Sequence, residues 1–406
     1  MTRIAIINLG ASGHINPTLG LTEELIRREH ELTYFSTQDF TRTIGSTGAT
    51  FRPYDSIFAK NIPAVEDIPK QVATFPLRLL EEAAHVVPQI LPAVAGFQPQ
   101  LILYDQMCVT GRLVAAALRV PGVALHPTYA TRPKEQRLGF PADSGPGAIA
   151  SEFASLAARL AAGLGIAPPT FADIHSHAEG LNIVFMPKAF HPGAEGLDER
   201  YQFVGPGFGR DARLGSTPRD GSQKRLFASM GTVFNQWPEF FRMCIEAFQG
   251  TEWQVDMAIG PRMDVASVAH TIPRNFSVAS YLPQREILPQ STVALYHGGM
   301  GTTMDALSFG VPLVVIPQMP EQEATGRRIA ELGLGLCLSR GTLSVAAVRE
   351  AIQAVAEDAV VKARVQAMQG TIQDTGGAPL AASLIEAFAQ KSEQGSRLEK
   401  LTSSPP

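Results

Sequence analysis

The chain has 406 residues, of which 45% are hydrophobic and 18% are charged. These fractions are typical of a globular enzyme and exclude a disordered chain, and the length predicts two domains of roughly 150–200 residues each. The net charge is −4, and no segment concentrates the basic residues. A nucleic-acid partner is therefore not expected.

The expected compartment is the cytosol. No stretch reaches the ~18 uninterrupted apolar residues of a membrane helix, and the apolar run at residues 4–9 is too short for a signal peptide. Cys108, Cys244 and Cys337 are lone thiols without a C-x-x-C pair. The sequence therefore predicts neither a disulfide framework nor a zinc site.

Short apolar runs alternate with longer amphipathic stretches along most of the chain. Several runs are continuously apolar, which is typical of strands buried on both faces of a parallel sheet. Strand–helix alternation over this length predicts a doubly wound α/β fold. The predicted strands are residues 4–9, 32–36, 101–104, 123–126, 181–186, 226–230, 254–259, 276–279, 293–296 and 311–316.

One segment interrupts this alternation. Residues 206–223 are rich in Gly, Pro and charge, without apolar periodicity, and predict an interdomain linker. Two Rossmann-like domains that face one another are expected, one at 1–205 and one at 224–379. A helical pattern at residues 380–390 opens the last segment, 380–406. Residues 131–177 are poor in apolar residues and predict either a long insertion or a mobile loop.

The first candidate site joins His14 to Asp105. His14 lies in a Gly-rich turn after the first predicted strand, and Asn16 and Pro17 predict that a helix begins there. Asp105 follows the strand at 101–104, so both side chains are expected at the carboxyl edge of one sheet. A carboxylate that holds the imidazole tautomer makes the other ring nitrogen a base for a hydroxyl proton. The alternative is a structural histidine and a loop-capping aspartate.

The second candidate site runs from His297 to Gln322. A predicted strand ends at Tyr296, and a Gly-rich turn leads into a short helix that begins near Thr302. Free N–H groups and the positive helix end predict a diphosphate site there, although the glycines by themselves are also compatible with a simple tight turn. The residues assigned to this donor site are His297, Gly299, Gly301 and Thr302 for the diphosphate, Asp305 for a ribose, Glu321 and Gln322 for sugar hydroxyls, and Ser229, Thr232, Tyr281, Leu282 and Gln284 at neighbouring strand ends.

A nicotinamide-dependent oxidoreductase is a weaker interpretation. Gly10 and Gly13 match part of a dinucleotide-binding fingerprint. The third glycine is absent, and the second predicted strand does not end on an acidic residue that could bind a ribose.

The sequence resembles family 1 of the glycosyltransferases, in particular the bacterial macrolide-glycosyltransferase, YjiC-like branch. The resemblance covers nearly the whole chain. The motifs that carry it are residues 13–17, 181–188, 203–206, 237–240 and 297–322.

This resemblance implies a GT-B fold, with the acceptor on the N-terminal domain and the donor on the C-terminal domain. It also implies a C-terminal helix that returns to the N-terminal domain and an inverting displacement without metal. The chain has no Asp-x-Asp motif. Carried over, His14 is the base and Asp105 its partner. Tyr281 stands where many relatives have Trp, and Glu321 where many have Asp, which leaves the nucleobase and the sugar open.

The predicted function is transfer of a hexose to a hydroxyl of a small lipophilic natural product such as a macrolide, a flavonoid or another phenol. UDP-glucose is the first candidate donor and a TDP-sugar the second, and a monomer or weak homodimer is expected. Alternatives are a catalytically silent nucleotide-sugar-binding protein and a nucleotide-sugar epimerase. The candidate acceptor residues, each also compatible with a core position, are Phe58, Phe75, Tyr129 and Phe140.

Overall fold

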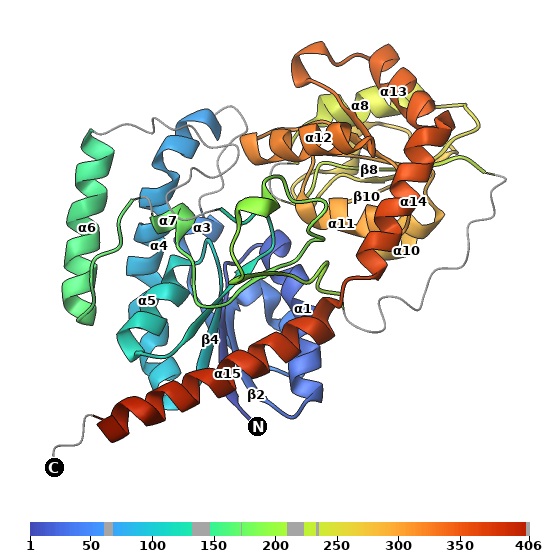
Figure 1. Cartoon of the computed structure of the whole chain (residues 1–406). Helices are drawn as coiled ribbons and strands as arrows, with labels where there is room; N and C mark the ends of the chain where they lie inside the picture. Colours follow the sequence, from blue (N-terminus) through green and yellow to red (C-terminus); the bar gives the residue numbers. More distant parts are fainter. Residues whose placement is uncertain (61–67, 132–146, 172, 209–222, 233–234, 403–406) are drawn as a thin grey trace.

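The computed structural model describes the chain except for residues 61–67, 132–146, 172, 209–222, 233–234 and 403–406. It contains two parallel β-sheets, each flanked by helices, which stand side by side (Figure 1). This confirms the predicted doubly wound α/β architecture. The predicted linker, 206–223, lies between the last strand of the first sheet and the first strand of the second.

The first sheet has the strand order β3-β2-β1-β4-β5-β6-β7, and every neighbouring pair is parallel. The central strands β1 and β4 are almost wholly buried, as their continuously apolar sequences predict. The strand bounds are β1 Arg3–Ile7, β2 Glu31–Thr37, β3 Thr50–Tyr54, β4 Leu101–Asp105, β5 Gly122–His126, β6 Asn182–Val184 and β7 Tyr201–Phe203.

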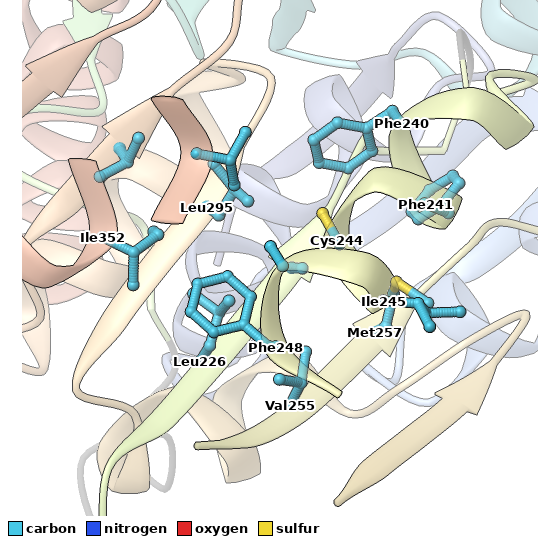
Figure 2. Close-up of a cluster of buried hydrophobic side chains, with 14 of the residues drawn as sticks. Leu226, Phe240, Phe241, Cys244, Ile245, Phe248, Val255, Met257, Leu295 and Ile352 are labelled. Carbon is cyan, nitrogen blue, oxygen red and sulfur yellow. The ribbon is translucent and has the colours of Figure 1, made fainter. Parts of the chain in front are cut away.

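The second sheet has the order β10-β9-β8-β11-β12-β13 and is also parallel throughout. Helix α8 packs Phe240, Phe241, Cys244 and Phe248 against β8 and β9, which gives this domain a dense apolar core (Figure 2). The strand bounds are β8 Arg225–Ser229, β9 Gln254–Ala258, β10 Phe276–Ala279, β11 Val293–Tyr296, β12 Leu313–Val315 and β13 Gly335–Cys337.

The helices connect these strands or cover the sheets. No helix in the described part of the chain is both long and apolar enough to cross a membrane. Short 3-10 turns lie at Gln38–Phe40, Ala194–Gly196, Leu288–Gln290 and Arg340–Thr342. The α-helices are α1 Ser12–Arg27, α2 Thr41–Gly45, α3 Ile57–Lys60, α4 Ile68–Phe97, α5 Val109–Leu118, α6 Ala148–Leu164, α7 Asp173–Ser176, α8 Pro238–Phe248, α9 Val265–Val268, α10 Gln284–Ile287, α11 Met300–Ser308, α12 Pro320–Leu332, α13 Val345–Glu357, α14 Ala359–Gln373 and α15 Gly377–Thr402.

Helix α1 begins earlier than the sequence predicts. Asn16 and Pro17 predict a start at Pro17, but the helix begins at Ser12, because Ala11 already has the extended backbone of a cap (φ −137°, ψ 133°). Pro17 consequently lies inside the helix, where it cannot donate a backbone hydrogen bond. The correction moves His14 from the preceding turn into the first turn of α1.

The C-terminal helix α15 packs against α1 of the first domain, as the family resemblance implies (Figure 1). It is longer than the predicted helix at 380–390. Arg28 at the end of α1 donates to the Glu386 carboxylate at 2.6 Å, and Gln100 donates to Glu393 at 2.6 Å. These bonds and the apolar contacts between the helices hold α15 against the first domain.

The two domains also contact each other directly. Arg328 on α12 of the second domain donates to the backbone oxygens of Ala189 and Phe190 in the first domain, both at 2.9 Å. The Tyr129 hydroxyl donates to Thr325 Oγ1 across the same interface at 3.4 Å. These contacts bring the carboxyl edges of the two sheets near each other.

Candidate active site

The structure brings His14 and Asp105 together. His14 Nδ1 lies 2.7 Å from Asp105 Oδ2, and the side chains are 18% and 0% exposed. Asp105 ends β4 and its Oδ1 accepts from the Met107 backbone N–H at 2.8 Å, so its orientation is fixed. Because a carboxylate can only accept, Nδ1 carries the hydrogen of the neutral imidazole, and Nε2 is the ring nitrogen that can take up a proton.

A buried polar group supports the first turn of α1. The Asn8 amide donates to the His14 backbone oxygen and to the Tyr34 hydroxyl, both at 3.0 Å. Tyr54 in turn donates to the Asn8 backbone oxygen at 2.6 Å. These bonds hold the turn between β1 and α1, and therefore the position of the histidine, against the carboxyl edge of the first sheet.

The Gly-rich turn of the second domain ends in the N-terminus of α11. Gly299 is the cap residue, and the first backbone N–H that bonds back to it is that of Thr303. The N–H groups of Met300, Gly301 and Thr302 therefore have no acceptor within the helix. Their direction and the helix dipole make this end suitable for an anion such as a diphosphate.

His297 lies half-buried beneath this turn. A side chain at Gly231 or at Gly299 would come within 2.6 Å of its ring, so only glycine fits at both positions. Burial lowers the pKa of His297 to about 4, while a backbone contact with Ser229 opposes the change. The ring is therefore neutral near pH 7. Its Nδ1 has no hydrogen-bond partner among the described residues.

Asp305 lies one turn further along α11, within a polar network. The Gln284 amide donates to Asp305 Oδ2 at 2.6 Å and accepts from the Thr302 hydroxyl at 3.0 Å. Arg285 Nε lies 3.5 Å from Asp305 Oδ1. Burial raises the pKa of Asp305 to about 6, and Arg285 and Gln284 oppose this increase. Gln284 thus joins the predicted diphosphate residue to the predicted ribose residue.

Glu321 and Gln322 lie in the first turn of α12, next to the same edge of the sheet. The Gln322 side-chain oxygen accepts from the Gln318 backbone N–H at 2.8 Å, which leaves its NH₂ group as the donor for a ligand. The remaining predicted residues line the neighbouring turns. Ser229 Oγ accepts from the Gly231 N–H at 3.2 Å, whereas Thr232 and Tyr281 are exposed and Leu282 is half-buried.

Comparisons with known proteins identify the family of the chain. Residues 254–384 match the family model of the erythromycin biosynthesis protein CIII-like C-terminal domain. The chain is 40% identical to the NDP-glycosyltransferase YjiC of Bacillus licheniformis, over 95% of this chain and 97% of the relative. The chain belongs to the family 1 glycosyltransferases, in the YjiC-like branch.

Two further relatives support this family assignment. The chain is 32% identical to the demethyllactenocin mycarosyltransferase of Streptomyces fradiae, over 95% of this chain and 86% of the relative. The crystal structure of the calicheamicin glycosyltransferase CalG4 superposes with a TM-score of 0.80, with 32% identity, covering 97% of this chain and 99% of the other. The two parallel-sheet domains of this glycosyltransferase thus form the GT-B fold.

The candidate acceptor residues that the structure describes lie in two separate places. Phe58 and Phe75 meet edge to face with ring centroids 6.0 Å apart, on α3 and α4 of the first domain. Tyr129 is buried at the domain interface, where it stacks on Phe190 at 6.4 Å. Its prediction as an acceptor residue does not fit this position, because its ring and hydroxyl are both used in packing. Phe140 lies outside the described residues.

Arg285 lies beside Asp305, in the predicted donor site, although the sequence does not single it out. A lone arginine after a glutamine in a polar turn is indistinguishable from a solvated surface residue, and only the contact with Asp305 distinguishes it. Among the described residues, no group of three or more His, Cys, Asp or Glu side chains is arranged as metal ligands would be.

Proposed function

We propose that this glycosyltransferase moves a hexose from a nucleotide sugar to a hydroxyl of a small lipophilic natural product, with inversion and without a metal ion. UDP-glucose is the first candidate donor, and macrolides, flavonoids and other phenols are the candidate acceptors. The His14–Asp105 pair carries the proposal, because a base oriented by a buried carboxylate serves attack by a hydroxyl.

In the proposed reaction, the acceptor O–H proton passes to His14 Nε2 while the acceptor oxygen forms a bond to the anomeric carbon. The bond between that carbon and the diphosphate oxygen breaks, and the nucleoside diphosphate leaves with the electron pair. Asp105 stabilises the imidazolium that forms. The negative charge that develops on the leaving group is stabilised by the first N–H groups of α11.

The donor is assigned to the second domain. Met300, Gly301 and Thr302 meet the diphosphate with His297 beside them, and Asp305 accepts from the ribose. Glu321 and Gln322 bind the sugar hydroxyls. Tyr281 is 76% exposed after β10 and supplies a free aromatic face on which a base can stack.

The names of the relatives widen the set of candidate donors. The name of the Bacillus licheniformis relative leaves the nucleotide open, and the Streptomyces fradiae relative is named for transfer of mycarose. TDP-sugars therefore belong in the donor screen beside UDP-glucose.

The test is a mass-spectrometric screen of UDP- and TDP-sugars against macrolides, flavonoids and simple phenols. We expect adducts of one hexose, at a rate that EDTA leaves unchanged. His14→Ala should lower kcat by ~10²–10⁴-fold without weakening donor binding, because a general base contributes about that factor. Turnover in this variant at the wild-type rate would overturn the assignment of the base.

Two alternatives have distinct outcomes in the same screen. A silent nucleotide-sugar-binding protein would bind donor without forming adducts, and an epimerase would convert the donor without an acceptor.

The three cysteines are free thiols, which supports the cytosol as the compartment in which the reaction is proposed to occur.

A further inference from the structure

Arg285 is a cation that lies between the Phe208 ring and the Asp305 carboxylate. Its guanidinium lies 4.0 Å from the ring centroid of Phe208, in the segment that follows β7. Its Nε lies 3.5 Å from Asp305 Oδ1 on α11. The contact with the aromatic face fixes the plane of the guanidinium. The side chain is 36% exposed.

Asp305 is the group on which this cation acts. Its carboxyl is 14% exposed and has a fixed orientation, because Gln284 donates to Oδ2 while accepting from Thr302. Burial favours the neutral acid, and Arg285 is the positive charge that opposes it. A neutral Asp305 would carry a hydrogen on one oxygen and would be a weaker acceptor for hydroxyl groups.

Other charges near α11 do not take over this role. The helix also packs against α1, α14 and the turn at Leu288–Gln290. Among the described residues, Arg285 is the one ionisable group that shifts the pKa of Asp305. The charged side chains on the neighbouring elements without such an influence are His14, Glu23, Glu24 and Arg27 on α1, Glu286 on α10, and Lys362 and Arg364 on α14.

We propose that Arg285 is a positioning residue for the nucleotide-sugar donor, which keeps the Asp305 carboxyl anionic so that it can accept from the ribose hydroxyls in the orientation that Gln284 gives it. The inference rests on the proposed donor-binding role of Asp305. It adds a specific consequence: without the cation, donor affinity becomes dependent on pH in the neutral range.

The expected change in donor affinity in Arg285→Met follows from the protonation of the Asp305 carboxyl. A cation at this distance lowers an aspartate pKa by about 1–3 units, so its removal raises the pKa of Asp305 from about 6 by at least about one unit. Only the ionised fraction binds ribose well. The Kd for the donor at pH 7 should therefore rise about 2- to 90-fold in Arg285→Met and return toward the wild-type value at higher pH.

The experiment measures UDP-glucose binding by calorimetry from about pH 5.5 to 8.5 in the wild type, Arg285→Met, Arg285→Lys and Asp305→Asn. UDP-glucose is the probe because its diphosphate does not titrate in this range. Arg285→Lys retains the charge and should bind nearly as the wild type does. Asp305→Asn should bind weakly at every pH. Arg242→Met, which removes a cation from an exposed pair on α8, should leave the pH profile unchanged.

The outcomes separate the two proposals. An affinity loss in Arg285→Met that disappears at high pH supports the role of Arg285. A loss of equal size at every pH, or no loss, overturns it, since a packing contact has no such pH dependence. If the wild-type protein binds neither UDP-glucose nor TDP-glucose, the donor assignment itself fails.

Discussion

Asp105→Asn is the substitution that most directly tests the proposed base. The Met107 backbone N–H donates to one side-chain oxygen of Asp105, and this contact should hold the asparagine oxygen in the same place. The asparagine NH₂ then faces His14 Nδ1, which must accept. The ring hydrogen moves to Nε2, so the nitrogen that should take the acceptor proton is already protonated.

The decrease in kcat in Asp105→Asn can be estimated from the 2.7 Å contact between His14 Nδ1 and Asp105 Oδ2. The centres of the two charges lie about 4 Å apart, and at an effective dielectric constant of about 20 they attract by about 4 kcal/mol. This attraction exists only after the imidazole is protonated, so it stabilises the transition state. Its removal corresponds to about a 10³-fold decrease in kcat.

The assay is steady-state turnover of the best donor and acceptor pair from the screen, with donor affinity and melting temperature measured in parallel. We expect kcat to fall while the Kd for the donor stays unchanged, because Asp105 lies on the other domain. Asp198→Asn removes an aspartate from an exposed pair with Arg200 and should keep wild-type turnover. A decrease in kcat of less than about tenfold in Asp105→Asn would refute the pairing as the source of base strength.

Two further predictions concern His297 in the proposed donor site. Gly231→Ala places a Cβ 2.6 Å from the His297 ring on a backbone with φ +80°. It should lower the free energy of unfolding by about 1–3 kcal/mol and weaken donor binding. The control is Gly250→Ala, at φ +69° with no neighbour within 4 Å, which should lose stability but keep its donor affinity. Equal donor affinity in both variants would contradict the argument that the new Cβ crowds His297. His297 has a folded-state pKa of about 4, below its unfolded value, so its contribution to stability is full above about pH 6.5 and is lost as the pH falls toward 4. The free energies of unfolding of the wild type and His297→Gln, measured with denaturant, should differ by an amount that changes by about 3 kcal/mol across this pH range. A difference that stays constant with pH would contradict a neutral His297 ring in the folded state.

The interior strands can be predicted from the sequence because a short, continuous apolar run is enough to indicate each of them. The predicted strand at 293–296 agrees with the interior strand β11. The missed strands, β3, β7 and β13, all lie at sheet edges. They are short or carry exposed residues, and their conformation depends on hydrogen bonds from a neighbouring strand. No local pattern encodes such a partner.

The start of α1 shows a local signal that the fold overrides. Asn16 and Pro17 have strong preferences for the beginning of a helix. The chain nevertheless enters the helix at Ser12 directly after the turn from β1. The difference matters for function, because it places His14 on a helical turn that Asn8 supports.

The sequence by itself predicted the α/β class, the positions of the interior strands and the candidates Asp105 and His297, since a side chain that follows a buried parallel strand must lie at the sheet's carboxyl edge. His14 and Asp305 were predicted from the Gly-rich turns and helix starts that come after such strands. The tertiary structure alone decided which of these side chains meet. It buried Tyr129 between the domains and brought Arg285 to Asp305. Contacts between residues distant in sequence depend on how helices and sheets pack, and no local pattern carries that information.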